Sequence, residues 1–287
     1  MNLIIGGTGQ VGQLLVKQLQ DARVRFRVLA HTGTSKEKLE AQGIDTVLGD
    51  YTQPQQLEPV FADIERIFLL TPTSPMQTQA EQTIIDAAKA AGVTYIVMIS
   101  VLAADSEPTL SLLRWHADSE AYLKASGLQY TILRPNAMMQ NFARVDRATI
   151  AGQSAMYATT GQSKVSFIDA SDLAEVAVKV LATDQLLGRT YELTGAEALS
   201  YPEVAAKFTH LLGRPIQYVN LSNEASRGAM ISAGIPDWYA DGLIGLYDFY
   251  RRGKGAIITN SVAQILGRQP TTLDSYLQAN RAVFAHS

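Results

Sequence analysis

The sequence predicts an α/β fold with a doubly wound parallel sheet and a smaller C-terminal α/β lobe. Three observations carry this prediction. Short apolar runs alternate with helical patterns through the first half of the chain. Glycines stand where several of those helices must end, and a glycine-rich turn directly follows the first apolar run. A chain of this kind joins parallel strands through right-handed crossover helices.

Six apolar runs have the length and composition of buried strands, and five segments between them place apolar residues at helical spacing. Gly43, Gly92 and Gly127 each stand between a helix and the next strand, where a chain often needs glycine to turn. We expect strands at residues 3–5, 25–29, 45–48, 66–70, 95–99 and 130–133, and helices at residues 11–20, 35–42, 54–62, 76–91 and 110–126.

The alternation loosens after Pro135, and we expect the rest of the chain to form the smaller lobe. An amphipathic helix follows Ser200 as its N-cap, carries Pro202 in its first turn and ends at Gly213. A segment rich in Gly, Met, Trp and Tyr also has a helical pattern. The expected elements here are a helix at residues 171–181, a strand at residues 190–193 and helical structure within residues 223–253.

The composition excludes several classes of function. Apolar residues make up 47% and charged residues 18% of the 287 residues, which fits a well-buried α/β core. The net charge is −3 and the basic residues are scattered, so we expect no nucleic-acid partner. The chain has no cysteine, which removes disulfides, thiolate zinc sites and cysteine nucleophiles, and we expect no bound metal. No signal peptide or membrane-spanning apolar run is evident, so we expect a cytoplasmic protein without a membrane span.

The stretch LIIGGTGQVGQLL links the first strand to the first helix and contains a glycine triplet with an extra glycine. In a dinucleotide-binding turn the first glycine permits a tight turn, the second lets a pyrophosphate approach the backbone, and the third lets the helix pack on the sheet. The diphosphate then lies at the positive end of the helix. The alternative is an ordinary glycine turn. We expect the diphosphate contacts to come from Gly6, Gly7, Thr8, Gly9, Gln10, Val11 and Gly12.

The end of the second strand indicates which dinucleotide is bound. NAD-binding proteins commonly place an acidic residue there for the ribose hydroxyls, whereas this chain reads FRVLAHTGTSKEK, without an acid at that point. His31 and Lys36 are the candidate contacts to a 2′-phosphate. We therefore expect NADP, with NADPH preferred over NADH. The alternative is that Lys36 and Lys38 form the solvated face of the second helix.

Further contacts are expected where other strands end, because ligands of parallel sheets bind at the carboxyl ends of the strands. Asp50 and Tyr51 end the third strand, where an adenine would lie. The fourth strand ends beside the expected nicotinamide ribose, and the fifth ends at Ser100, whose role we leave open. The candidates at the fourth strand are Leu70, Thr71 and Pro72.

Motifs along nearly the whole chain carry a resemblance to a known family. They are GGTGQVG, GDYTQP, AAKAAGV, H-x-x-S-E, YTILRPNAMMQNF, YELTGAEALSYPEVAAKFTHLLGRPIQY and ILGRQPTTLDSYL. Together they resemble the NmrA-like family of atypical short-chain dehydrogenases, above all the bacterial branch with NADPH-dependent quinone oxidoreductases and triphenylmethane-dye reductases. The resemblance implies a Rossmann domain, a small C-terminal lobe and a substrate cleft between them.

The resemblance also implies particular residues. It assigns the glycine-rich turn to the diphosphate and His31 to the adenosine end, although many relatives have arginine at that position, which weakens the preference for NADP. It places residues 136–141 along the nicotinamide pocket, with Asn136, Ala137 and Met138 as cofactor contacts. We expect residues 1–150 to form the NAD(P)-binding Rossmann domain. Residues 151–287 would form the substrate-binding lobe, interleaved with the sheet, in a monomer or homodimer.

The helix at residues 110–126 lacks the Tyr-x-x-x-Lys pair with which ordinary short-chain dehydrogenases protonate a carbonyl oxygen. Tyr250 and Lys254 have the spacing, but they lie far downstream with a glycine between them. The helix offers His116 and Glu120 instead, which share one face and can touch. They are the catalytic candidates, with Glu120 fixing the tautomer of His116 and raising its pKa. The alternative is that both hold the helix in place without titrating.

The absence of the Tyr-x-x-x-Lys pair indicates which kind of substrate the site can reduce. Hydride delivered to a saturated ketone makes an alkoxide that needs a proton from the site, whereas a quinone or cationic dye becomes a delocalised anion or a neutral product. We therefore expect a small aromatic or quinone-like acceptor. Methionine adapts to varied shapes and aromatic rings stack on flat molecules, although such residues also build ordinary cores. The candidate substrate contacts are Met139, Asn141, Phe142, Trp238 and Tyr239.

Three functions fit these features. The first is an NAD(P)H-dependent oxidoreductase that transfers hydride to quinones or similar conjugated, electron-poor acceptors. The second is a non-catalytic NAD(P)-binding redox sensor that regulates a protein partner, since the wider family includes such regulators. The third is a sugar-nucleotide isomerase or epimerase, which is disfavoured because it depends on the absent tyrosine. We favour the oxidoreductase over the sensor.

Overall fold

The structure is a computed structural model that describes residues 1–285. Its packing forms two compact units whose segments alternate along the chain. The first unit comprises Met1–Thr109, Leu113–Arg134 and Leu173–Glu192, and the second comprises Leu110–Leu112, Pro135–Asp172 and the chain from Leu193 onward. The division into domains at residue 150 stays a prediction.

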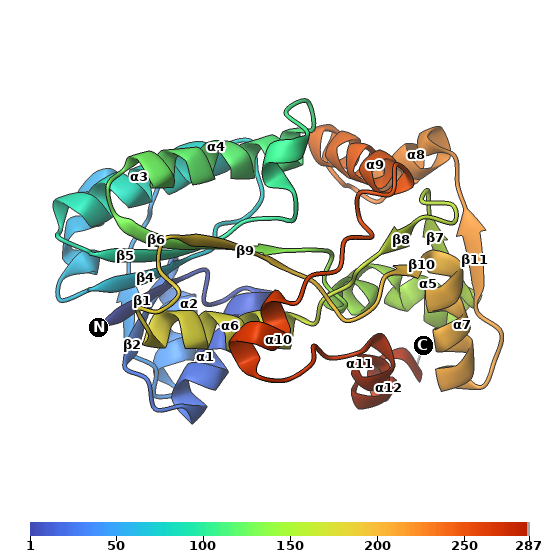
Figure 1. Ribbon diagram of the computed structural model, residues 1–287, viewed down its shortest axis with the longest axis horizontal. Coiled ribbons are helices and arrows are strands. Elements are labelled where there is room, and N and C mark those ends of the chain that lie inside the picture. Colours follow the sequence, from blue (N-terminus) through green and yellow to red (C-terminus); the bar gives the residue numbers. More distant parts are fainter. Residues whose placement is uncertain (286–287) are drawn as a thin grey trace. The chain divides into compact units, whose positions relative to one another are not determined.

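The first unit is built on a seven-stranded sheet, which confirms the predicted fold class (Figure 1). The six strands expected from the first half all form and pair in parallel with their neighbours. The order across the sheet is β3-β2-β1-β4-β5-β6-β9. The strands are β1 (Asn2–Ile5), β2 (Phe26–Ala30), β3 (Thr46–Leu48), β4 (Arg66–Leu69), β5 (Tyr95–Ile99), β6 (Gln129–Pro135) and β9 (Arg189–Leu193).

The last of these strands was expected in the smaller lobe, and the structure instead adds it to the main sheet beside β6. The amide of Gly188 donates to the carbonyl of Tyr130 at 2.7 Å, and the amide of Asn136 donates to the carbonyl of Leu193 at 3.0 Å. From the first of these bonds to the second, the residue numbers increase along both β6 and β9, so the two strands run parallel. The chain therefore returns to the sheet after Asp172 and supplies its seventh strand.

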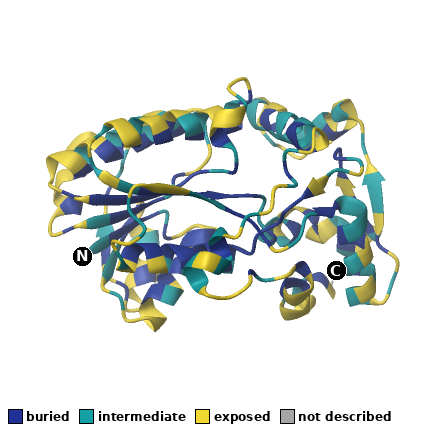
Figure 2. Cartoon of the chain, viewed as in Figure 1, coloured by how far each residue is buried: buried dark blue, intermediate teal, exposed yellow. Residues whose placement is uncertain are grey.

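Helices cover both faces of this sheet. Figure 1 shows α3 (Gln77–Ala90) and α4 (Ser111–Ala125) on one face, and α1 (Gln10–Asp21), α2 (Gly33–Glu40) and α6 (Ala170–Ala182) on the other. The strands between these layers are largely buried, whereas the outer helix faces are exposed (Figure 2). Doubly covered parallel strands read as continuous apolar runs, which is why the sequence predicted them well.

One expected helix is wrong. Residues 54–62 form two short 3₁₀ helices, η1 (Pro54–Gln56) and η2 (Glu58–Phe61), in place of one α-helix. Pro59 lies in the middle of the segment and has no amide hydrogen to donate to the preceding turn. The glycine stops are confirmed, because Gly43, Gly92 and Gly127 have φ of +73°, +80° and +83°.

The second unit contains two small sheets and several helices. One sheet pairs β7 (Ala155–Ala158) with β11 (Gln217–Asn220) in parallel, and the other pairs β8 (Lys164–Val165) with β10 (Leu199–Ser200) antiparallel. The predicted cap of α7 is confirmed as a capping box between Ser200 and Glu203, and Gly213 ends the helix with φ of +67°. The helices are η4 (Phe142–Asp146), one turn of π-helix, then α5 (Arg147–Gln153), α7 (Tyr201–Leu212), α8 (Asn223–Ser232), α9 (Asp237–Arg251), α10 (Ser261–Leu266), α11 (Leu273–Ala279) and α12 (Arg281–Ala285).

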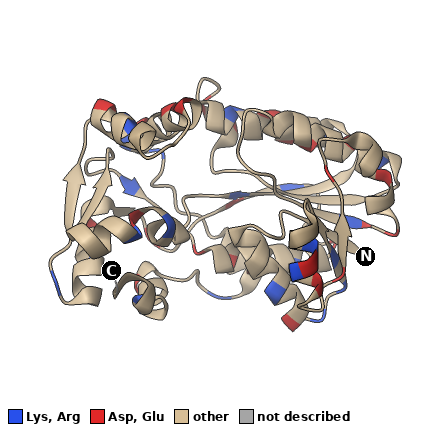
Figure 3. Ribbon diagram, turned by 180° about the vertical axis from the view of Figure 1, so that it is seen from behind, with Lys and Arg blue, Asp and Glu red and all other residues tan. Residues whose placement is uncertain are grey.

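No helix within residues 1–285 is long and apolar enough to cross a bilayer. The same residues contain no group of three or more His, Asp or Glu side chains arranged to hold a metal ion. Basic and acidic side chains are interspersed along the elements rather than gathered by sign (Figure 3).

Candidate functional site

The glycine-rich turn of the first unit connects β1 to α1. Gly6 has φ of +87°, and a Cβ there would lie 2.3 Å from the carbonyl oxygen of Leu70. A Cβ on Gly12 would lie 2.0 Å from the carbonyl oxygen of Gly6. The fold itself therefore requires glycine at both positions, one for the turn and its approach to the end of β4, the other for packing the helix on the turn.

Gly9 differs from its two neighbours in the motif. Its φ is −77°, which any residue adopts, and the nearest protein atom to a Cβ there would be 3.4 Å away, an ordinary contact. Gly9 is exposed and acts as the N-cap of α1 without a side-chain cap, so the first amides of the helix have no side-chain acceptor at this cap. The packing of the protein therefore does not require glycine at position 9, and the first amides of α1 beside it have no side-chain acceptor.

The ends of β2 and β3 bring three predicted residues together. The rings of His31 and Tyr51 meet edge to face, with centroids 4.3 Å apart. Asp50 lies close enough to His31 for its charge to act on the imidazole: burial lowers the pKa of His31, and Asp50 opposes that shift. Asp50 itself accepts hydrogen bonds from the amide and hydroxyl of Thr52, both at 2.8 Å, and they lower its pKa.

Lys36 has a partner on its own helix. Its ammonium group forms an ion pair with Glu40, one turn further along α2. This pairing favours the reading in which Lys36 belongs to the solvated face of the helix. Thr32, directly after His31, is the N-cap of α2 and accepts a hydrogen bond from the amide of Ser35 at 3.1 Å.

The end of β4 includes a buried carboxylic group that the sequence analysis missed. Leu70 is partly buried, Thr71 is buried and Pro72 is exposed. The Thr71 hydroxyl donates to Glu81 Oε1 on α3 at 2.6 Å, and Glu81 is 1% exposed. Burial raises the pKa of Glu81, although hydrogen bonds from neighbouring side chains oppose the shift. The buried Glu81 therefore fixes the orientation of the Thr71 hydroxyl.

His116 and Glu120 both lie on the buried side of α4, but each has a different main partner. Gln77 Nε2 on α3 lies 3.0 Å from His116 Nδ1, so the glutamine is the neighbour that bears on the imidazole tautomer. Burial lowers the pKa of His116 to about 4, although the charge of Glu120 acts in the opposite direction. The net shift is thus opposite to the expected one, and His116 is neutral at pH 7.

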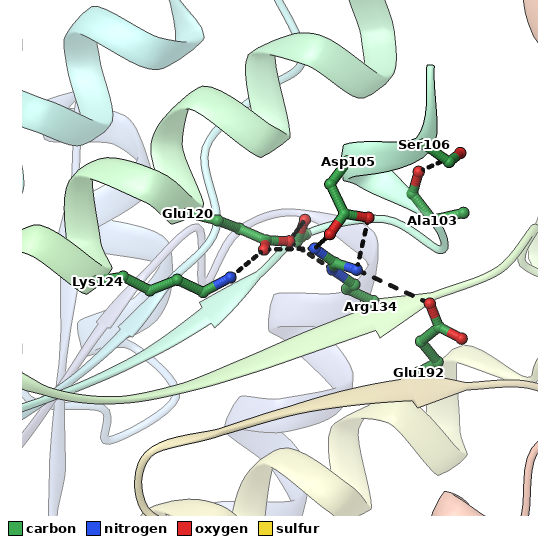
Figure 4. A network of polar contacts seen from close by, with 8 residues as sticks. Ala103, Asp105, Ser106, Glu120, Lys124, Arg134 and Glu192 are labelled. Carbon is green, nitrogen blue, oxygen red and sulfur yellow. Dashed lines mark hydrogen bonds and ion pairs between the residues drawn. The ribbon is translucent and has the colours of Figure 1, made fainter. Parts of the chain in front are cut away.

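Glu120 forms a bidentate ion pair with Arg134 at the end of β6. Arg134 Nε donates to Oε1 and Nη2 donates to Oε2, both at 2.7 Å, and the Ser100 hydroxyl donates to Oε1 at 2.6 Å (Figure 4). Lys124 and Asp105 extend the network from either side. Burial raises the pKa of Glu120, but the hydrogen bonds from Arg134, Ser100 and Lys124 outweigh it and lower the pKa overall.

The predicted contacts of the second unit begin with Asn136, whose side chain is already engaged. Its amide nitrogen donates to Ser166 Oγ at 2.8 Å and to the carbonyl of Gly255 at 2.9 Å, and its oxygen accepts from the amide of Ala137 at 2.8 Å. Asn136 therefore fixes the course of the backbone at the start of this segment. The following Met138 forms an isolated parallel bridge with Ile168.

Met139 and Phe142 are core residues, each 1% exposed. Phe142 lies among three other rings, with centroids 5.0 Å from Phe167, 5.9 Å from Phe208 and 6.3 Å from Tyr201. This placement favours the alternative in which both residues pack the lobe.

The other predicted acceptor contacts are partly buried rather than enclosed. Asn141 precedes η4, and Trp238 and Tyr239 lie side by side on α9, with ring centroids 5.3 Å apart. Their contact with an acceptor stays a prediction.

The parallel sheet and the glycine-rich turn between its first strand and first helix define a Rossmann-type α/β protein. The model of the NmrA-like family matches residues 2–277. The chain belongs to the NmrA-like family.

Two known proteins and one solved structure are similar to the chain over almost its whole length. The NAD(P)H azoreductase of Xenophilus azovorans is 33% identical over 284 residues, which is 99% of each chain. Quinone oxidoreductase 2 of Escherichia coli (strain K12) is 30% identical over 278 residues, 95% of this chain and 96% of the relative. The crystal structure of an Escherichia coli NADPH-dependent quinone oxidoreductase complexed with NADPH superposes with a TM-score of 0.89, at 27% identity, over 97% of this chain and 99% of that chain.

Proposed function

We propose that this chain is an NAD(P)H-dependent oxidoreductase that transfers hydride to quinones or similar conjugated, electron-poor acceptors. The observation that carries the proposal is full-length similarity to two reductases of this kind, one at 33% and one at 30% identity. The similarity includes the fold, the glycine-rich turn and the second unit, so it extends beyond a shared nucleotide-binding half.

NADP is the proposed cofactor, and the residues present fit it. The glycine at position 9 leaves room that the protein itself does not use, next to helix amides suited to a diphosphate. His31, Asp50 and Tyr51 lie together where the adenosine would bind. The bound cofactor would supply the hydride, and the chain's residues would hold and orient it. Further contacts are proposed from Leu70, Thr71, Pro72, Ser100, Ala137 and Met138.

The acceptor is proposed to be small and aromatic or quinone-like. Residues of the second unit that are partly buried, among them Asn141, Trp238 and Tyr239, offer a polar and stacking surface for it. His116 and Glu120 remain the catalytic candidates of the first unit, but a neutral imidazole and an arginine-bound carboxylate favour a structural role. We place the enzyme in the cytoplasm as a monomer or homodimer.

The preference for NADPH is testable at His31. Replacing it with aspartate puts an acid where the ribose 2′ position would lie, which repels a 2′-phosphate and accepts from a 2′-hydroxyl. The His31→Asp variant is expected to lower the ratio of kcat/KM for NADPH over NADH by about tenfold or more, which corresponds to about 1.4 kcal/mol or more, because the new carboxylate repels the 2′-phosphate. Lys38→Ala is the matched surface control and should leave the ratio unchanged. An unchanged ratio in His31→Asp would remove His31 from the 2′ site.

The reaction itself is tested by following nicotinamide absorbance with purified protein, NADPH or NADH, and a simple quinone. Turnover that depends on the quinone and is faster with NADPH supports the proposal. Tight cofactor binding without turnover, across a panel of quinones and dyes, would favour the redox sensor. A sensor should also distinguish oxidised from reduced cofactor in its affinity.

A further inference from the structure

Glu81 is a buried acid on α3 whose presence the packing of the first unit does not explain. Its side chain is 1% exposed. One carboxylate oxygen, Oε1, accepts a hydrogen bond from the Thr71 hydroxyl at 2.6 Å, whereas the other, Oε2, has no hydrogen-bond partner among the described residues. Burying a carboxyl group that is only partly hydrogen-bonded is unfavourable, and such a group in a folded protein requires an explanation.

The side chains next to Glu81 are polar, but they do not complete its hydrogen bonding. Gln77 on α3 and Ser119 on α4 are 1% and 0% exposed, and both act against the rise in the pKa of Glu81 that burial causes. Each nevertheless has a buried atom without a hydrogen-bond partner in the described part of the chain, Gln77 Oε1 and Ser119 Oγ. Apolar side chains would join these two helices without unsatisfied groups, so helix packing alone does not account for the acid.

Thr71, the partner of Glu81, lies at the edge of the sheet where the cofactor is proposed to bind. The preceding Leu70 contacts the glycine-rich turn at two points. Its amide donates to the carbonyl of Ile5 at 3.3 Å, and its carbonyl oxygen is the atom that a Cβ on Gly6 would meet at 2.3 Å. Ligands of parallel sheets bind at this edge. Glu81 therefore holds a hydroxyl one residue away from the backbone that touches the turn.

The direction of the hydrogen bond decides what Thr71 can offer to a ligand. A threonine hydroxyl has one hydrogen and two lone pairs. Because its hydrogen is directed to the carboxylate of Glu81, the oxygen is left to accept. Thr71 is 6% exposed, so the orientation of its hydroxyl is decisive for any contact it makes. The oxygen suits a ligand hydroxyl, which can donate, and not an ionised phosphate oxygen, which can only accept.

We propose that Glu81 is a positioning residue for the cofactor: it binds the hydrogen of the Thr71 hydroxyl and so directs the oxygen of Thr71 to accept from a hydroxyl group of the nicotinamide ribose. This proposal rests on the proposed function, because it requires that the chain bind a nicotinamide dinucleotide. Glu81 does not touch the cofactor and acts only through Thr71.

The opposite account makes Glu81 a structural link between α3 and the end of β4. A positioning residue affects only ligands that contain the nicotinamide ribose, and its effect disappears once Thr71 has no hydroxyl. A structural link affects stability and weakens every ligand of the site alike. Ligand choice and a double-mutant cycle therefore distinguish the two roles.

The experiment measures the affinity of the full-length protein by isothermal titration calorimetry, and its Tm by thermal unfolding. The ligands are NADPH and 2′,5′-ADP, which has the adenosine and the 2′-phosphate but no nicotinamide ribose. The variants are Glu81→Met, Glu81→Gln, Thr71→Val and the double variant Thr71→Val/Glu81→Met. The matched control is Tyr122→Phe, which removes a hydroxyl that donates to Asp86 on the same helix at 2.8 Å. The solution is kept at pH 8, because burial raises the pKa of Glu81 and alkaline conditions favour the carboxylate.

Thr71→Val is expected to bind NADPH about tenfold more weakly, which corresponds to the loss of one hydrogen bond, and Glu81→Met about fivefold more weakly. Glu81→Gln should stay within about twofold of the wild type, because its amide oxygen can still accept from Thr71. The double variant should be about tenfold weaker, whereas two independent changes would give about fiftyfold. The affinity for 2′,5′-ADP should change by less than about twofold in every variant, and the control should bind both ligands normally.

The double variant also controls for a loss of folding. Replacing both partners of a buried hydrogen bond by apolar groups of similar shape is nearly neutral or stabilising. The Tm of Thr71→Val/Glu81→Met should therefore equal or exceed that of the wild type while its affinity for NADPH falls.

Three results would overturn the proposal: equal losses for NADPH and 2′,5′-ADP, losses that add in the double variant, or a loss in Glu81→Gln as large as in Glu81→Met. Unchanged affinities in all variants of a wild type that binds NADPH would also overturn it and leave the proposed function intact. If the wild type binds no nicotinamide dinucleotide, the proposed function fails and the positioning role fails with it. Binding is measured without an acceptor, so the result does not depend on turnover.

Discussion

At the scale of single residues, the three glycines of the glycine-rich turn have different roles, and one substitution distinguishes a binding role from a folding role. The fold forbids a side chain at positions 6 and 12, whereas a Cβ on Gly9 would make only an ordinary contact at 3.4 Å. Gly9→Ala should therefore fold with an unchanged Tm but bind NADPH about tenfold more weakly or worse, because a methyl group would hold the diphosphate off the backbone.

Thermal unfolding and a fluorescence titration with NADPH measure the two quantities separately. Gly12→Ala is the comparison variant, because its Cβ would lie 2.0 Å from the carbonyl oxygen of Gly6 and the backbone must shift. It should lose about 1–3 kcal/mol of stability, as overpacked sites do. Undiminished NADPH affinity in Gly9→Ala would place the diphosphate elsewhere.

Sequence reasoning succeeded where a residue's role depends on its neighbours in the chain, and failed where it depends on distant ones. The glycine-rich turn and the cap at Ser200 are local, and both were predicted. Arg134 and Glu81 became meaningful only through partners 14 and 10 residues away on other elements. The sequence does carry a weak signal for them, since each is a charged residue on an otherwise buried strand end or helix face.

At the scale of elements, the Glu120–Arg134 pair joins α4 to β6 and should be needed for stability. Both side chains are nearly inaccessible, at 2% and 8% exposure. Glu120→Ala leaves the guanidinium buried without its bidentate partner, which typically costs about 3–5 kcal/mol. Urea unfolding checks this value, and Lys124→Ala is the control. Because Lys124 is 39% exposed, its pair should contribute about 1 kcal/mol or less.

The same pair predicts a pH dependence with a definite sign. The pKa of Glu120 is lowered in the folded protein below its ordinary value of 4.5. Its contribution to stability is therefore present above pH 4.5 and is lost as pH falls through the folded value. Glu120→Gln should accordingly lose less stability, relative to the wild type, as the solution is made more acidic. A difference that stays constant from pH 6 to pH 3 would contradict this account.

His116 ties α3 to α4 and provides the test of whether it also acts as an acid. Its pKa of about 4 leaves it neutral throughout the range in which reductases are assayed. His116→Asn, which can still contact Gln77, is expected to keep the shape of the activity–pH profile and to change kcat by less than about tenfold, well short of the 10²–10⁴ effect of general acid catalysis. Loss of an inflection between pH 5 and pH 8 would instead restore His116 as a proton donor.

For the elements, as for the residues, the sequence predicted what depends on local patterns and not what depends on distant parts of the chain. The strands buried on both faces of the sheet were recognisable as apolar runs, and the helices by their spacing. The segment at residues 54–62 failed because Pro59 interrupts its hydrogen bonds. The seventh strand was recognised as a strand, yet its place beside β6 depends on a return of the chain that no local pattern encodes.

At the scale of the whole molecule, the two units have different kinds of buried acid, and this affects how global stability responds to pH. In the first unit Glu120 is ionised and held by arginine, and its pKa is lowered. In the second unit Asp146 has no partner among the described residues, and its pKa is raised. The first acid makes the protein less stable on acidification, and the second makes it less stable as the pH rises.

The sign for Asp146 follows from its two pKa values, 3.8 as the ordinary value and about 7 in the folded protein. The folded state holds the proton more tightly than the unfolded state. The favourable contribution is therefore complete below pH 3.8 and is lost as the pH rises through about 7. A difference of about three pKa units corresponds to roughly 4 kcal/mol.

Asp146→Asn removes this titration and keeps the size of the side chain. Its free energy of unfolding, relative to the wild type, should increase from pH 4 to pH 8 by an amount on the order of 4 kcal/mol, because other groups titrate alike in both proteins and cancel in the difference. Urea unfolding at pH 4, 6 and 8 measures the change. Asp241→Asn, at an exposed ion pair with Arg227, is the control and should show no comparable rise. A pH-independent difference for Asp146→Asn would mean that the carboxylate is stabilised in the folded state after all.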